Sequence, residues 1–275
     1  MKDQTQSETK EKTKGYLYLI FPDSVLINRY HVNQVRSAVE NSKCKNLDLI
    51  IDSPGGDAYS AVKIIRILRH KFENITGIVP FYAMSAATLM MLGTNKIFMG
   101  EESQLGPLDL PIEHPTDGSR ISALDVVNSL NQLSSTSRTI AEDRFDFLKN
   151  RLGKVISAKI AFESADNLIK PVVSKLDPYH IQKGFRELKI AQWYAFDLLR
   201  TGMMRNDPNS AWETATKFVH SFPDHSYAIF KEDAVDTLSL NVGNSDDYVE
   251  WQNISNEIES EKKGLVTASI KYIEK

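Results

Sequence analysis

Short apolar strands alternate with helical segments over the first hundred residues, and this alternation limits the folds open to the chain. The predicted strands cover residues 15–21, 47–52, 75–83 and 96–100. The helical segments between them cover residues 33–41, 57–71 and 85–93. In the second of these helices, apolar residues recur at three- and four-residue spacing, which is typical of an amphipathic helix. Apolar strands alternating with helices predict a parallel α/β core.

The second half of the sequence is dominated by helical spacing. Helices are predicted over residues 121–151, 154–170, 178–199 and 211–222, and a further strand over residues 225–230. The aromatic residues Trp193, Tyr194 and Phe196 favour a core or an interface. We expect residues 1–14 to form a solvated polar tail, residues 15–242 to form one domain, and the charged residues 243–275 to form a docking helix or a loose tail.

Composition excludes several classes of protein. Hydrophobic residues make up 41% and charged residues 25% of the sequence, which is typical of a soluble globular protein. A net charge of -3 gives no general attraction to nucleic acid. A single cysteine, Cys44, suits a reducing compartment, and the polar N-terminal segment has no signal-peptide pattern, so a cytoplasmic location is expected. Residues 75–95 are uncharged and long enough to cross a bilayer, but Gly77 and Pro80 favour a buried strand followed by a buried helix.

The first chemically suggestive turn is Ser53-Pro54-Gly55-Gly56-Asp57, directly after a predicted strand. A glycine pair at the start of a helix lets main-chain N–H groups point outward and bind an anion or an oxyanion. The same pair could simply allow a tight passage from strand to helix. The glycine and lysine motifs of nucleotide-binding loops are missing from the sequence.

The second turn, residues 83–88, places Ser85 at the end of a strand and at the start of a buried helix. Small alanine neighbours would let a substrate backbone approach the hydroxyl, as in a nucleophile elbow. The alternative is an ordinary N-cap serine. Open α/β sheets bind their ligands at the carboxyl ends of the strands, so the two turns are expected to be neighbours.

These residues carry a resemblance to a known family. The runs IDSPGGDAYSAVKIIRILR and IVPFYAMSAATLMMLGTNKIFMGEESQLGPLDL resemble the serine dehydrogenase proteinase family, a branch of the Clp protease/crotonase superfold. They are also similar to signal peptide peptidase A and to NfeD-type membrane serine proteases. The resemblance implies a Clp/crotonase-like ββα superhelix with a helical second half. It further implies that Ser85 is the nucleophile, and that amides of Gly55 or Gly56 and of Ala86 form the oxyanion hole, without a metal or cofactor.

The general base is the most important of the points at which this sequence departs from the family. Clp proteases carry a histidine about twenty-five residues after the nucleophile, where this chain has Leu108-Asp109-Leu110. Signal peptide peptidases use a lysine, and the corresponding stretch offers only Arg120, which does not deprotonate near neutral pH. The segment FPDHSYAIF resembles the strand that carries the Clp aspartate, which makes His225 a candidate base. Asp109 could orient it or could be a capping or turn residue, and a lysine base stays open.

The leading hypothesis is therefore a serine peptidase that acts on peptides or proteins, with membrane-associated substrates possible and nucleic acid not expected. Relatives of the superfold close their sites with neighbouring subunits, which implies a homo-oligomer. One alternative is acyl-CoA chemistry of the crotonase type, which uses the same oxyanion hole without a serine nucleophile. Another is a catalytically silent scaffold that oligomerises or binds peptides, which the missing base favours.

Overall fold

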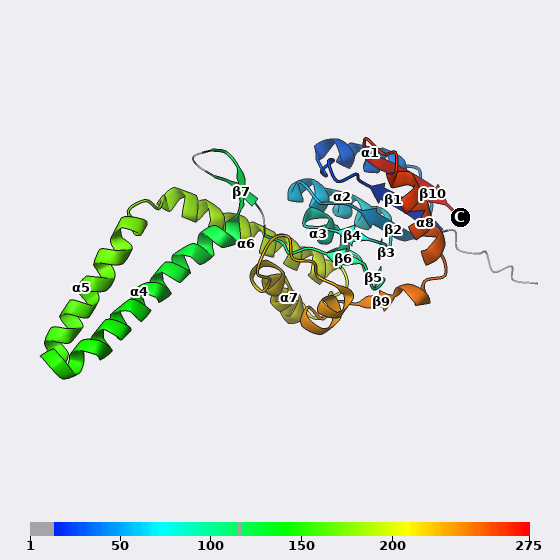
Figure 1. Ribbon diagram of the computed structural model, residues 1–275. Coiled ribbons are helices and arrows are strands. Elements are labelled where there is room, and N and C mark those ends of the chain that lie inside the picture. The colour runs from blue at the N-terminus through cyan, green and yellow to red at the C-terminus, as the bar shows by residue number, and fades with distance from the viewer. Residues whose placement is uncertain (1–13, 110, 115–116) are drawn as a thin grey trace, which may run out of the picture. The chain divides into compact units, whose positions relative to one another are not determined.

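The computed structural model describes residues 14–109, 111–114 and 117–275 (Figure 1). The chain divides into two compact units. One contains the residues up to Leu108 together with Ala191–Lys275, and the other contains Asp109–Ile190. The polar tail expected over residues 1–14 lies outside the described residues, except for Lys14, which begins the first strand.

The first unit is built on a six-stranded sheet with the order β10-β1-β2-β3-β5-β9. Its strands are β1 (Lys14–Ile20), β2 (Asn46–Asp52), β3 (Asn74–Val79), β5 (Lys96–Met99), β9 (Val242–Asn244) and β10 (Ser269–Glu274). All neighbouring pairs are parallel except β1 and β10, which are antiparallel. The predicted parallel α/β core is confirmed.

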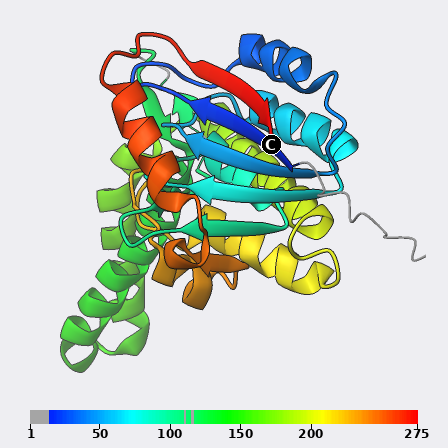
Figure 2. The same cartoon turned by 90° about the vertical axis from the view of Figure 1, so that its right-hand side faces the viewer.

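Helices cover both faces of this sheet (Figures 1 and 2). Helix α8 (Trp251–Lys262) crosses one face, where Ile254 and Ile258 pack in a core cluster with side chains of β1, β2 and β3. The other face is covered by α1 (Arg29–Val39) and α2 (Ala58–Lys71), with α3 (Ala86–Leu92) in contact with α2. Because successive side chains of a strand point to opposite faces, β2 contributes buried residues to both layers. A sheet covered on both faces accounts for the continuous apolar runs in the sequence.

A second, two-stranded sheet lies next to the carboxyl end of β2. Strands β4 (Tyr82–Ala83) and β6 (Gln104–Leu105) pair in parallel, and single bridges join Ser53 to Ala83 and Leu105 to Ile229. The strand predicted over residues 225–230 is wrong, since only Ile229 bridges. The residues before it form turns, in which the Asp224 carboxylate accepts the Ser226 N–H at 2.7 Å.

The C-terminal residues 243–275 form regular structure. The 3₁₀ turn η2 (Ser245–Asp247) leads into α8, and β10 then pairs along β1 at the edge of the sheet. From the sequence, these residues are expected to form a docking helix or a loose tail. Strand β10 is therefore an element that was not predicted from the sequence.

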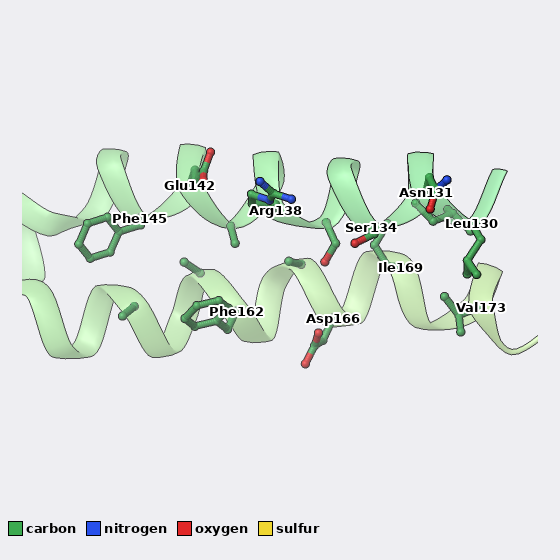
Figure 3. A pocket seen from close by; sticks show the side chains of 16 residues that line it. Leu130, Asn131, Ser134, Arg138, Glu142, Phe145, Phe162, Asp166, Ile169 and Val173 are labelled. Atoms are coloured by element: carbon green, nitrogen blue, oxygen red, sulfur yellow. The ribbon is translucent and has the colours of Figure 1, made fainter. Parts of the chain in front are cut away.

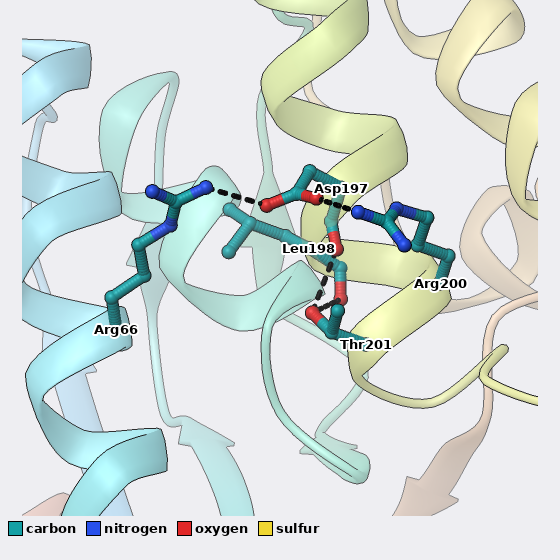
Figure 4. A network of polar contacts seen from close by, with 5 residues as sticks. All are labelled: Arg66, Asp197, Leu198, Arg200 and Thr201. Carbon is teal, nitrogen blue, oxygen red and sulfur yellow. Dashed lines mark hydrogen bonds and ion pairs between the residues drawn. The ribbon is translucent and has the colours of Figure 1, made fainter.

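Helices α6 (Pro178–Thr201) and α7 (Pro208–His220) follow the predicted helical segments, and the single-turn π-helix η1 (Asp233–Thr237) comes later. Within the first unit, the Asp197 carboxylate of α6 accepts Arg66 from α2 at 2.8 Å and Arg200 at 2.5 Å (Figure 4). This ion-pair network fixes the C-terminal part of α6 to α2. The side chain of Trp193 is half exposed, and its ring meets those of Phe196 and Trp212 edge to face.

The second unit is a helical hairpin. A short antiparallel pair, β7 (Pro111–Glu113) and β8 (Arg120–Ser122), leads into α4 (Ala123–Leu152) and α5 (Lys154–Val173). Gly153, with φ of 76°, makes the turn between the two helices, a conformation that glycine adopts without strain. Both long helices confirm the predicted pattern. In the part of the chain that the structure describes, no helix is both long and apolar enough to cross a membrane.

Candidate active site

Ser85 occupies a strained turn between β4 and α3. Its backbone has φ of 49° and ψ of -111°, a region that residues other than glycine rarely adopt. The side chain makes no capping hydrogen bond to α3, and the residue is 8% exposed. The hydroxyl is therefore not used as a helix cap. Strain of this kind is typical of sites where a side chain has to be presented to a ligand.

Two glycines allow the backbone to pass close to Ser85. A Cβ on Gly55, which has φ of 101°, would lie 2.6 Å from the Met84 carbonyl oxygen and 3.1 Å from Ser85 Cβ. A Cβ on Gly106 would lie 2.9 Å from the Ser85 nitrogen. Thr88 joins the two segments, because its hydroxyl donates to the Ala83 carbonyl at 2.6 Å and accepts the Gly106 N–H at 2.9 Å. The loop after β2 and the segment after β6 thus both lie against the serine turn.

The amides of the Gly55–Gly56 turn differ in their partners. The Gly55 N–H donates to the Ser53 hydroxyl at 3.1 Å, and the Gly55 carbonyl accepts Ile27 N–H at 2.8 Å. No cis peptide bond occurs among the described residues, so the N–H of Gly56 points opposite to the Gly55 carbonyl and away from Ile27. Ala86 is the first residue of α3, and its N–H is one of those that a helix leaves without an intrahelical partner. Gly56 and Ala86 are therefore better suited than Gly55 to donate to an oxyanion.

His225 lies in the turns that precede Ile229, and Ile229 exchanges main-chain hydrogen bonds with Leu105, the residue before Gly106. The imidazole is partly buried. Its Nδ1 is buried and has no hydrogen-bond partner in the described part of the chain. The pairing of Ile229 with Leu105 thus joins the segment of His225 to β6, which is followed by Gly106 beside the Ser85 turn. The role of His225 as base stays a prediction.

Asp109 is buried and caps a helix. One of its carboxylate oxygens accepts the N–H of Leu124 at 3.0 Å, in the first turn of α4. A carboxylate at this position also interacts favourably with the helix dipole. The orienting role for His225 stays a prediction. Of the other positions at which this chain departs from the family pattern, Leu110 lies outside the described residues, as does the side chain of Arg120.

One cluster near the turns was missed by the sequence analysis. Asp52, the last residue of β2 and fully buried, forms a 2.6 Å ion pair with Lys262 at the end of α8. Lys262 also donates to the Tyr82 hydroxyl at 2.9 Å, and that hydroxyl donates to Asp23. Burial raises the pKa of Asp52 to about 6, against the opposing effect of Lys262. The sequence feature that could have indicated this cluster is the acidic residue at the end of an apolar strand, because a buried carboxylate requires a partner for its charge.

The helical hairpin contains a cavity of its own. It measures about 970 Å³ and runs between α4 and α5, with Phe145 and Phe162 toward one end and Leu130 and Val173 toward the other (Figure 3). Its lining contains no residue of the Ser85 surroundings. The residues that line it all belong to the second unit.

Comparison with known proteins identifies related chains. A family model described as ClpP-like SDH-type serine proteinase matches residues 23–170, just over half of the chain. Two uncharacterised proteins of Methanocaldococcus jannaschii are similar in sequence. One is 39% identical over 94 residues, which are 34% of this chain and 30% of that protein. The other is 38% identical over 63 residues, 23% of this chain and 22% of that protein. The match thus spans less than a third of either relative.

Two solved structures have a similar arrangement of elements. One is a serine-to-alanine mutant of the 1510-N membrane-bound stomatin-specific protease, with a TM-score of 0.46, 14% identity, and coverage of 88% of this chain and 82% of that chain. The other is a lysine-to-alanine mutant of that protease in complex with a substrate peptide, with a TM-score of 0.44, 14% identity, and coverage of 79% and 71%.

Proposed function

The chain belongs to the ClpP-like SDH-type serine proteinase family, and from this premise we propose that it is a serine peptidase that forms an acyl-enzyme on Ser85. The observation that carries the proposal is the conformation of Ser85, strained and without a capping hydrogen bond between a strand and a helix. The family match includes this turn and the Gly55–Gly56 turn. A serine held in this way presents its hydroxyl to a ligand instead of to its own helix.

In the proposed reaction, the Ser85 oxygen attacks the carbonyl carbon of a peptide bond, and the base takes the hydroxyl proton. The negative charge that develops on the carbonyl oxygen is stabilised by the N–H groups of Gly56 and Ala86. Each such donor is typically worth about 3 kcal/mol to the transition state. The base then delivers the proton to the leaving amine, and water hydrolyses the acyl-enzyme in the reverse sequence.

We assign the base to His225. The support is the buried, unpartnered Nδ1 and the bridge that joins this segment to Leu105, one residue before Gly106. Asp109, which also accepts the N–H of Leu124, is the proposed orienting carboxylate. A lysine is the alternative base.

Labelling with a fluorophosphonate tests the function. Such a probe reacts with an activated serine hydroxyl, so the wild-type chain should become labelled in a time-dependent way, and peptide mass spectrometry should locate the adduct on Ser85. An unlabelled but folded wild-type chain would contradict the peptidase proposal and favour the silent scaffold. Measurable affinity for a coenzyme A thioester in that unlabelled chain would favour crotonase-type chemistry instead.

The proposed substrates are peptides or proteins, in a cytoplasmic setting, and we expect the chain to form a homo-oligomer. Exposed aromatic surface supports the last point, since Trp193 is 50% and Trp212 39% exposed, and the rings of both meet Phe196 edge to face. Light scattering at micromolar concentration should give a mass of at least twice 31.1 kDa. Replacing both tryptophans with serine should lower that mass. A monomeric wild-type mass would refute the oligomer.

A further inference from the structure

Strand β2 carries two buried aspartates that point to the same face of the sheet. Asp48 and Asp52 are four residues apart and both fully buried, and period-two alternation places them on the α8 side together with Ile50. Each carboxylate has its own lysine at 2.6 Å, Lys14 for Asp48 and Lys262 for Asp52. The strand therefore contains two closely matched ion pairs, one near its beginning and one at its end.

Only the second pair adjoins the serine turn. Asp52 is followed directly by Ser53, whose hydroxyl accepts the Gly55 N–H and whose own N–H donates to the Tyr82 carbonyl at 3.0 Å. Lys262 binds both sides of this junction, because its ammonium contacts Asp52, donates to the Tyr82 hydroxyl and lies 4.2 Å above the Tyr82 ring. Tyr82 precedes Ser85 by three residues.

On the basis of the proposed function, we propose that Lys262 is a positioning residue for the oxyanion hole. By joining the end of β2 to β4, it holds the loop of Ser53 to Gly56 against the turn that carries Ser85. We call this set of contacts, from Asp52 through Lys262 to Tyr82, the clamp. The ammonium acts through these main-chain segments and does not touch the reacting atoms. The Lys14–Asp48 pair has the same chemistry at the far end of the strand and holds neither segment.

Proton uptake by Asp52 gives the clamp a pH dependence. The charged and titratable groups that face it are Lys262 from α8, Tyr82 from β4 and Asp23 from the loop after β1. With a pKa of about 6 in the fold, against about 3.9 in an unfolded chain, Asp52 gains a proton on folding between these values. Its stabilising contribution is complete below about pH 4 and is lost as pH rises through 6. The ion pair, in contrast, is complete only above pH 6.

The test compares Lys262→Met with Lys14→Met, which removes the matched pair. At pH 7.5 we expect Lys262→Met to slow fluorophosphonate labelling by about 10-fold to 100-fold, less than or similar to the loss of one oxyanion donor. Lys14→Met should label within about two-fold of wild type, and Lys262→Arg should restore most of the rate. Hydrogen exchange of the peptide containing residues 53–57 should be faster than wild type in Lys262→Met only.

A pH series adds a readout that general destabilisation would not move. Protonation of Asp52, whose pKa is about 6, breaks its ion pair with Lys262, so the ratio of the wild-type labelling rate to that of Lys262→Met should be largest above pH 6 and fall toward one below it, whereas the ratio for Lys14→Met should not change with pH. If Lys262→Met does not fold, Tyr82→Phe keeps the Asp52–Lys262 ion pair and removes the hydroxyl that joins Lys262 to β4, together with its hydrogen bond to Asp23. Slower labelling with faster exchange at residues 53–57 is then expected.

Equal effects of Lys262→Met and Lys14→Met on labelling, or unchanged exchange of residues 53–57 in the folded Lys262 variant, would overturn the positioning role. Failure of the peptidase proposal has a different signature, because the wild-type chain would then not be labelled at all. The exchange measurement needs no catalysis and tests the clamp in either case.

Discussion

Replacing Ser85 with alanine is expected to reduce peptidase turnover by about a million-fold, the loss found when a serine nucleophile is removed, while the chain stays folded. The hydroxyl makes no capping hydrogen bond, so its loss should cost less than about 1 kcal/mol of unfolding free energy. Glycine at this position should stabilise the chain. The strain of a non-glycine residue at φ of 49° is worth about 1–3 kcal/mol, more than the entropy cost of glycine at about 0.5–1 kcal/mol.

Both variants can be followed by hydrolysis of a peptide substrate and by urea unfolding. An inactive Ser85→Gly chain with a higher unfolding midpoint than wild type would show that the backbone conformation which presents the hydroxyl lowers the free energy of unfolding. Wild-type-like turnover in Ser85→Ala would end the serine peptidase proposal. A lower midpoint for Ser85→Gly would contradict the strain interpretation alone.

Replacing His225 with glutamine should lower kcat by about four orders of magnitude or more, as removal of a triad base does, with little change in substrate binding. The reason is that the base acts on the proton in the transition state and makes no contact that the ground state requires. His70→Gln is the matched control, since His70 lies exposed near the end of α2. It should leave kcat unchanged.

The rate profile against pH separates the two candidate bases. A histidine base gives a rate that rises through neutral pH, and a lysine base moves the rise into the alkaline range. Near-normal kcat in His225→Gln, with an alkaline rise, would assign the base to a lysine. Loss of labelling without loss of substrate affinity would support His225.

The parallel core and the serine turn could be predicted because their signals are local. Strands such as β2 are buried on both faces and read as apolar runs, and glycine at Gly55 is required by a positive φ and by the Met84 carbonyl. The choice between the amides of Gly55 and Gly56 could not be made from the sequence. It depends on the Ser53 hydroxyl and on Ile27, which lies almost thirty residues away.

Elements that depend on distant partners were predicted less well. Residues 225–230 have strand-like composition, yet Asp224 and Ser226 favour a turn, and only Ile229 finds a partner. Strand β10 is half polar, as edge strands often are. Its partner β1 is at the other end of the chain, so no pattern in the neighbouring sequence indicates the pairing. The partner of Asp52 is in the C-terminal helix, so nothing near Asp52 in the sequence indicates Lys262.

The pairing of β1 with β10 has a consequence for how the chain folds during synthesis. Gly15 pairs with Glu274, and the main chains of Lys14 and Lys275 exchange hydrogen bonds. A ribosome-bound chain therefore carries β1 with one edge unpaired until nearly all of this sequence has emerged. Loop closure over such a separation is slow, and an open apolar strand edge is prone to pair with other chains. We expect shortened nascent chains that end before β10 to aggregate or recruit chaperones.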